Sequence, residues 1–190
     1  MRSAAILFFL VTSINAYAVE QEPLIHYGEN HVFTIEIPDG WFNDAENAKI
    51  AGLPYLLRPK HEKNFNYTYI YAAGDGSVKA NTKLDTVVQR GIDGFKERYG
   101  NIWVQKGIVF HNKENKYLTG KVKLVEYANI PEKFGKYKES VFYIQAHKSV
   151  VIIVFSSKSK SDYDHLFKDF EKVINSFYFV SDNPKSVLKK

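Results

Sequence analysis

Two amphipathic stretches that flank a run of strand-like segments are the feature of this sequence that most constrains its fold. Apolar residues recur every three or four positions over residues 84–99, and again over residues 163–177. This spacing predicts two helices, each with one apolar face. Four segments between them either alternate apolar and polar residues or are apolar throughout, as strands do; they are residues 102–110, 120–127, 140–147 and 150–155.

The upstream part of the chain adds three predicted strands. Residues 32–37 alternate apolar and polar side chains, residues 65–73 are rich in Tyr, and residues 52–59 suggest an edge strand. Residues 150–155 are apolar at every position, so we expect a central strand that is covered on both faces. Strands joined by hairpins and interrupted by helices favour an α+β fold, with helices packed on a mainly antiparallel sheet.

Short motifs indicate where the two helices begin and how one of them packs. Thr82 with Asp85, and Ser161 with Asp164, have the spacing of a capping box at a helix N-terminus. Gly91 lies beside the apolar stripe of the first helix, where a glycine weakens the helix by about 1 kcal/mol relative to Ala. We expect close packing of this helix on the sheet to offset part of that cost.

The first eighteen residues have the pattern of a secretory signal peptide. Arg2 supplies a positive start, Ala4–Val11 is an apolar run, and Ala16-Tyr17-Ala18 presents small residues at the cleavage positions. The apolar run is shorter than the roughly 20 residues that a membrane-spanning helix needs; a buried N-terminal helix is the alternative. We predict cleavage before Val19 and an exported protein, periplasmic or secreted.

The mature chain is predicted to be one domain over residues 19–182, followed by a basic tail over residues 183–190. It has no cysteine, which excludes disulfides, thiolate metal sites and a cysteine nucleophile, so its stability must come from its core. The 14 Phe, 13 Tyr and 2 Trp residues suit that role. The net charge of +5 is spread along the chain and few arginines occur, which argues against a nucleic-acid partner.

Two segments resemble the PsbP-like family. The strand that ends in Ile37-Pro38-Asp39-Gly40-Trp41 is similar to the opening of these domains. The closing segment is similar too, with Val154-Phe155-Ser156, a polar loop, and then Phe167, Phe170, Ile174 and Ser176-Phe177. The family includes a lumenal photosystem II subunit, import factors that bind the GTPase Ran, and exported bacterial proteins of unknown role. The resemblance implies an α-β-α sandwich and a non-enzymatic binding or assembly role, but it transfers no binding residues.

The sequence carries no motif of a known catalytic or cofactor site. It has no Gly-x-Ser-x-Gly elbow, no phosphate loop ending in Lys-Ser/Thr and no His-Glu-x-x-His pattern. We therefore predict no enzymatic activity and no cofactor. His26 and His31, with Glu29 between them, would bind a transition metal weakly or lie as surface loop histidines; we assign no metal site.

The residues that follow the predicted strand 32–37 allow two interpretations, a catalytic site or a solvated loop. Asp39, Asp44 and Glu46 offer carboxylates for glycoside hydrolysis, but a solvated loop has the same composition. Trp41 would either stack on a sugar or pack in the core, and the family pattern favours the core. Asn66 starts a glycosylation sequon, which matters only in a eukaryotic secretory pathway.

The hairpin of residues 131–138, between the predicted strands 120–127 and 140–147, is the candidate contact site. It presents an apolar anchor among cations, and we predict that a protein or envelope component binds Phe134, Lys133, Lys136 and Lys138. A solvated loop without a partner is the alternative for this hairpin. For the whole protein, the alternatives are a basic surface that binds an anionic envelope component, with Lys121 and Lys123 on the same face, and an exported hydrolase that uses Asp, Glu and His.

Overall fold

The computed structural model describes residues 22–61, 68–75, 78, 82–108, 122–146 and 148–188. The predicted signal peptide, its cleavage site before Val19, the sequon residue Asn66 and Lys121 lie outside the described residues. Among the described residues, no helix combines the length and the apolar character that crossing a membrane requires.

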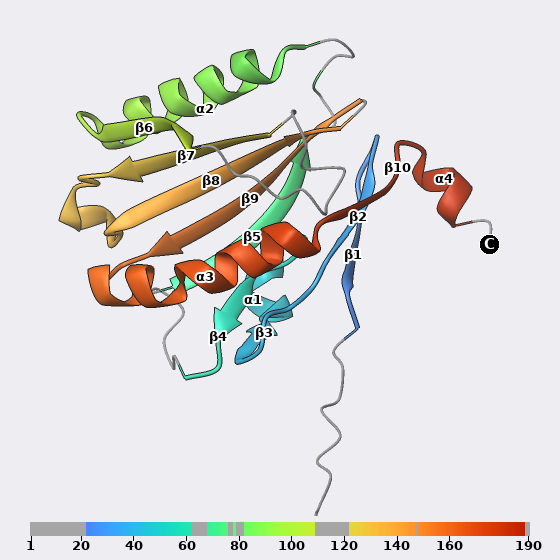
Figure 1. Cartoon of the computed structure of the whole chain (residues 1–190), viewed down its shortest axis with the longest axis horizontal. Helices are drawn as coiled ribbons and strands as arrows, with labels where there is room; N and C mark the ends of the chain where they lie inside the picture. The colour runs from blue at the N-terminus through green and yellow to red at the C-terminus, as the bar shows by residue number, and fades with distance from the viewer. Residues whose placement is uncertain are drawn as a thin grey trace, which may run out of the picture.

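A seven-stranded antiparallel sheet forms the centre of the molecule (Figure 1). Its strand order is β3-β4-β5-β9-β8-β7-β6, which places the apolar strand β9 in the middle, as the sequence predicts. The short strand β4 is internal, so the predicted edge position of residues 52–59 is wrong; the edge is β3. The strands are β3 (Trp41–Asn43), β4 (Leu57–Pro59), β5 (Thr68–Asp75), β6 (Trp103–Ile108), β7 (Val122–Ala128), β8 (Lys138–Gln145) and β9 (Val150–Ser157).

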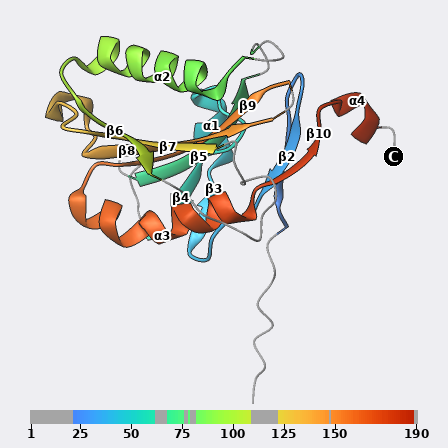
Figure 2. The same ribbon diagram turned by 45° about the horizontal axis from the view of Figure 1, so that its top comes forward.

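Two long helices cover opposite faces of this sheet (Figure 2). Helix α2 (Leu84–Tyr99) packs on β7 and β8, whereas α3 (Lys160–Ser176) packs on β9, β5 and β8. The short helix α1 (Ala45–Ile50) connects β3 to β4. This layering is the α-β-α arrangement of an α+β fold, which confirms the predicted fold class.

A second, three-stranded antiparallel sheet stands beside the first and was not predicted. It consists of β1 (Leu24–Tyr27), β2 (Val32–Ile35) and β10 (Tyr178–Ser181), with β2 in the centre. Strand β10 follows α3 directly, and α4 (Pro184–Val187) comes after it. Part of the segment predicted as a basic tail is therefore helical. Pro184 is compatible with this helix, because proline is well tolerated in the first helical turn.

The core has one apolar cluster on each face of the large sheet. On the α3 face, Phe155 stacks on Phe170 with ring centroids 5.6 Å apart, and both side chains are fully buried. On the α2 face, Phe95 stacks on Tyr127 at 3.8 Å, and Ile92 is buried beside them. Strand β9 contributes side chains to both clusters, so it is the element that joins the two layers.

The helix starts differ from the predicted capping boxes. Helix α3 begins two residues earlier than expected. Its N-cap is Ser159, whose Oγ accepts a hydrogen bond from the backbone N–H of Asp162 at 2.9 Å. Ser161 is an exposed residue within the helix. The residue at the N-cap of α2 is Lys83, whose side chain makes no capping hydrogen bond, so Thr82 is not the N-cap that the sequence predicts.

Gly91 provides the close contact that the sequence predicts. A Cβ atom at this position would lie 2.3 Å from the hydroxyl of Tyr143 on β8. No side chain except hydrogen fits there, so the cost of a glycine within α2 is offset by the approach of the helix to the sheet.

Candidate functional site

A pocket of about 580 Å³ opens on the α2 face of the sheet, where α2 ends. We call it the hairpin pocket, because the loop between β7 and β8 forms one wall. Aromatic rings and cations dominate the lining, and a few small or aliphatic residues complete it. The lining residues are Tyr69, Tyr71, Phe95, Tyr99 and Phe134; Arg98, Lys133, Lys136 and Lys158; and Ala51, Leu53, Leu56, Gly135, Glu139 and Ser156.

Strand register builds the floor of the hairpin pocket. Ser156 on β9 pairs with Tyr69 on β5 and with Glu139 on β8, so these three side chains lie in one row across the sheet. Ser156 is 1% exposed, and its Oγ has no hydrogen-bond partner within the described part of the chain. A buried hydroxyl without a partner costs free energy, and because the Oγ of Ser156 has almost no accessible surface, a molecule in the pocket does not reach it.

The hairpin loop directs an aromatic ring towards α2. A single 3-10 turn, Glu132–Phe134, ends at Gly135, whose φ of +64° lies in the left-handed region that suits glycine. This turn sets the ring of Phe134 edge-on to Tyr99, with centroids 4.8 Å apart. Phe134 is nevertheless 37% exposed, so it offers an apolar surface at the mouth of the pocket.

Lys136 is held inside the pocket by a buried carboxylate. Its Nζ lies 2.5 Å from Oε2 of Glu139, which is 3% exposed, and 5.8 Å above the ring centroids of both Tyr69 and Tyr99. Burial disfavours the charged amine, but the attraction of Glu139 outweighs it and raises the pKa of Lys136 above its usual range. The pair therefore stays ionised and largely cancels its own charge.

Two cations at the mouth have no such counter-charge. The Arg98 guanidinium lies 5.9 Å above the ring of Tyr99, and the Lys133 amine lies 5.0 Å above the ring of Phe134. Among the described residues, no carboxylate forms an ion pair with either of them. The mouth is thus positively charged and bordered by rings, an arrangement that suits an anion.

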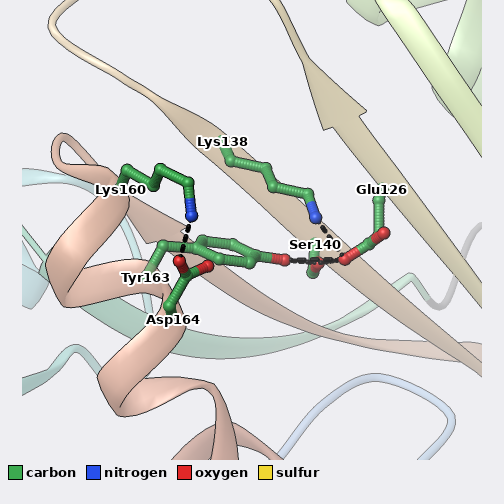
Figure 3. Close-up of polar contacts among 6 residues, drawn as sticks. All are labelled: Glu126, Lys138, Ser140, Lys160, Tyr163 and Asp164. Carbon is green, nitrogen blue, oxygen red and sulfur yellow. Dashed lines mark hydrogen bonds and ion pairs between the residues drawn. The ribbon is translucent and has the colours of Figure 1, made fainter.

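Lys138, grouped with the hairpin residues by sequence, lies on the opposite face of the sheet (Figure 3). Its Nζ is 2.7 Å from Oε1 of Glu126 and 4.6 Å from the ring centroid of Tyr163 on α3. The Tyr163 hydroxyl also donates to Glu126 at 2.9 Å, and it shares a hydrogen bond with Ser140. The structure therefore brings Phe134, Lys133 and Lys136 together and assigns Lys138 to a buried polar network.

The two histidines noted in the sequence do not form a surface loop pair. His31 is 1% exposed, and its ring lies 5.2 Å from that of His26 and 5.8 Å from that of Phe33. Across the described residues, no three His, Asp or Glu side chains are grouped as a metal site would require. The surface interpretation is wrong for His31, which is a buried ring that packs on Phe33 and lies close to Gly74 on β5.

Two of the three carboxylates after the first predicted strand, Asp39 and Asp44, have different surroundings. Asp44 is buried in an ion pair with Arg58 at 2.8 Å, and it also caps α1 by accepting from the N–H of Asn47. Burial disfavours its ionised form, but the hydrogen bonds from Asn47 and Arg58 dominate and lower the pKa of Asp44. Asp39 instead lines a separate pocket with Glu36 and Lys172, so Asp39 and Asp44 do not share one site.

Trp41 packs in the core, as the family pattern favours. It is 1% exposed, and its indole N–H donates to Oδ2 of Asp169 on α3 at 3.1 Å. This bond satisfies the buried indole and ties β3 to α3, so Trp41 is unavailable for stacking on a ligand.

Sequence reasoning missed most of the hairpin pocket. Tyr69, Ser156 and Arg98 come from three elements far apart in the chain, and only the sheet order brings them to the hairpin. The one usable sequence signal was the Arg98-Tyr99 pair at the end of a predicted helix, directly before Gly100.

Comparison with known proteins identifies the fold. No protein-family model and no curated protein matches the sequence. The solution structure of cyanobacterial PsbP (CyanoP) from Synechocystis sp. PCC 6803 matches with a TM-score of 0.51 and 13% identity, over 90% of this chain and 99% of that chain.

Two other solved structures match with similar scores. A point mutant of the protein Mog1 has a TM-score of 0.50 and 12% identity, over 84% of this chain and 96% of its own. LpqN, involved in cell envelope biogenesis of Mycobacterium tuberculosis, has a TM-score of 0.50 and 11% identity, over 84% of this chain and 90% of its own. The chain therefore has the PsbP-like fold, as the sequence resemblance implies.

Proposed function

We propose that this protein is an exported binding or assembly module that recognises a partner through the hairpin pocket and catalyses no reaction. The fold that it shares with CyanoP, Mog1 and LpqN supports a binding or assembly role in general. The signal-peptide pattern of residues 1–18 supports export.

The observation that carries this proposal is the convergence of aromatic rings and uncompensated cations at one pocket. Tyr99, Phe134, Arg98 and Lys133 come from α2 and from the hairpin, and they meet at its mouth. A volume of about 580 Å³ lies within the roughly 300–1,000 Å³ typical of ligand sites. Tyr and Arg are also the residues that most often dominate binding energy at protein interfaces.

The chemistry of the lining favours binding over hydrolysis. Glu139 is the one carboxylate among the lining residues, and Lys136 neutralises it. The lining residues include no histidine, and no carboxylate apart from the paired Glu139, that would act as a general base for Ser156. A broad basic face, the second possibility, has less support, because Lys123 pairs with Asp85 and Lys138 lies on the other side of the sheet.

The test is capture of partners by the mature protein and by a pocket variant. Immobilised protein is incubated with an extract of its own cell envelope, and bound proteins are quantified by mass spectrometry. The variant carries Arg98→Ala, Lys133→Ala and Phe134→Ala. We leave Lys136 and Lys138 intact, because removing either would leave Glu139 or Glu126 buried without its cation and destabilise the fold.

A matched control removes an Arg, a Lys and an exposed apolar side chain elsewhere. Arg90→Ala, Lys168→Ala and Leu188→Ala lie outside the pocket and outside the exposed face of the small sheet. We expect the pocket variant to lose the captured partner while the control keeps it, with equal thermal midpoints. Equal capture by both variants would exclude the hairpin pocket as the partner-binding site. Turnover of a substrate by the purified protein would overturn the proposed non-enzymatic role.

A further inference from the structure

We propose that His31 is an acid-sensitive latch, whose protonation releases the turn between β1 and β2, residues 28–31, from the end of strand β5. This inference does not depend on the hairpin pocket or on the proposed function. It follows from the way the imidazole is enclosed, from the lack of partners for its nitrogens and from the charges around it.

Two glycines from different parts of the fold enclose the tip of the His31 ring. Gly28 belongs to the turn that His31 ends, and Gly74 lies on β5 of the large sheet. A Cβ atom added at Gly28 would lie 2.0 Å from Nε2 of His31, and one added at Gly74 would lie 1.9 Å from the same atom. No side chain larger than hydrogen fits at either position, so the imidazole fills the contact between the turn and β5.

The enclosed ring has no hydrogen-bond partner among the described residues. His31 is 1% exposed, and nothing in this part of the chain pairs with its Nδ1 or its Nε2. The neutral imidazole leaves one N–H and one acceptor unpaired, whereas the imidazolium would bury two unpaired N–H donors and a full charge. Because neither nitrogen has accessible surface, the charged form is favoured only after the ring moves into water.

The groups around the ring set the direction of its response to pH. The ring of His26 on β1 lies 5.2 Å from that of His31, Phe33 on β2 offers an apolar ring at 5.8 Å, and Glu29 in the turn is exposed. Asp75 at the end of β5 favours protonation, but burial outweighs it and lowers the pKa of His31 below its usual range. The closed turn is therefore the stable form at pH 7, and acid favours the open form.

The strands on either side of the turn are held unequally, which favours a local opening. Strand β1 lies at the edge of the small sheet and pairs with β2, and the Tyr55 hydroxyl also donates to the carbonyl of Ile25 on β1. Strand β2 is paired on both sides and packs on α3. Within the turn, the N–H of Gly28 donates to the carbonyl of His31 at 2.9 Å. We therefore expect this bond to break while β2, β10 and α3 stay folded.

The test is an NMR titration of the wild-type protein between about pH 7.5 and about pH 4.5. Histidine ring signals report the pKa of His31. Hydrogen exchange of the Gly28 amide, corrected for the direct effect of pH on exchange, reports opening of the turn. Opening that takes up one proton grows by up to about tenfold per pH unit below about pH 6.5. We expect this slope at Gly28, with protection there lower than that of the α3 amides at every pH.

Three variants separate the latch from other effects of acid. His31→Gln stays neutral at every pH, so the slope at Gly28 should disappear. His26→Gln is the matched control, because it makes the same change on the neighbouring ring and leaves His31 in place; the slope should remain. Gly74→Ala puts a methyl group where the ring of His31 lies, so the turn should be open already at about pH 7.5 and change little in acid.

Several results would overturn this inference, and the first two need no variant. One is a His31 that titrates near pH 6.5 while the Gly28 amide stays protected, because the ring would then accept a proton inside the closed turn. Another is equal protection of Gly28 and the α3 amides at each pH, because acid would then unfold the whole domain. An unchanged slope in His31→Gln would assign the response to a different group.

Discussion

At the scale of single residues, glycine shows how local sequence preference and packing compete. Gly91 and Gly94 both lie within α2, where glycine is unfavourable. The two positions differ in what a side chain would meet, because a Cβ at Gly91 would clash with the buried Tyr143 and a Cβ at Gly94 has nothing within 4 Å.

We therefore expect opposite effects from the same substitution. Gly94→Ala should stabilise the protein by about 0.4–1 kcal/mol, because it lowers the entropy of the unfolded chain. Gly91→Ala should destabilise it by about 1–3 kcal/mol, because Tyr143 or the helix must shift. Urea denaturation of both variants measures this, and a stabilised Gly91→Ala would show that α2 does not pack closely on β8.

We expect two histidines, the buried His31 and the partly buried His26, to make stability depend on pH. Burial, followed by the charge of His31, lowers the pKa of His26 to about 4, and burial likewise lowers the pKa of His31, with Asp75 acting in the opposite direction. The unfolded chain has a histidine pKa near 6.5, so acid favours the unfolded state. The two neutral histidines contribute fully to the free energy of unfolding above about pH 6.5, and this contribution is lost as the pH falls towards 4.

Between pH 7 and pH 5 we expect the free energy of unfolding to fall by about 1–2 kcal/mol from His26 alone. His26→Gln should reduce the pH dependence by that amount, as measured by urea denaturation at several pH values. The same slope in wild type and variant would mean that His26 is solvated in the folded protein.

At the scale of elements, the sequence predicted the long helices and most strands of the large sheet. Their apolar periodicity extends over enough residues to exclude other structures. The strands β1, β3 and β10 were missed, because each has four residues or fewer and is fixed by partners distant in sequence. For β10, the partner is Thr34 and Phe33 on β2, far upstream.

The sequence predicted Ser161 as the N-cap of α3, but Ser159 suits an N-cap equally well. The structure assigns the cap to Ser159. We expect Ser159→Ala to cost about 1 kcal/mol and Ser161→Ala to change the free energy of unfolding by less than about 0.5 kcal/mol. Chemical denaturation decides between them, and a larger loss in Ser161→Ala would place the helix start where the sequence predicted it.

At the scale of the whole molecule, the candidate site was only partly predictable. Phe134 and its neighbouring lysines stand out as an apolar residue among cations. Lys138 looks equivalent in sequence, yet it begins β8 on the same face as Ser140 and Phe142, which α3 covers. Which helix covers which face depends on the order of strands, and local periodicity does not contain that order.

The most direct test of the binding account is hydrogen–deuterium exchange of the mature protein, alone and with its captured partner. We predict protection of residues 95–99 at the end of α2 and of residues 131–137 in the hairpin. The outer face of the small sheet exposes Ile25, Tyr27, Tyr178 and Val180 and is the main competing surface. Protection confined to that sheet, with unchanged exchange around the hairpin pocket, would contradict the account.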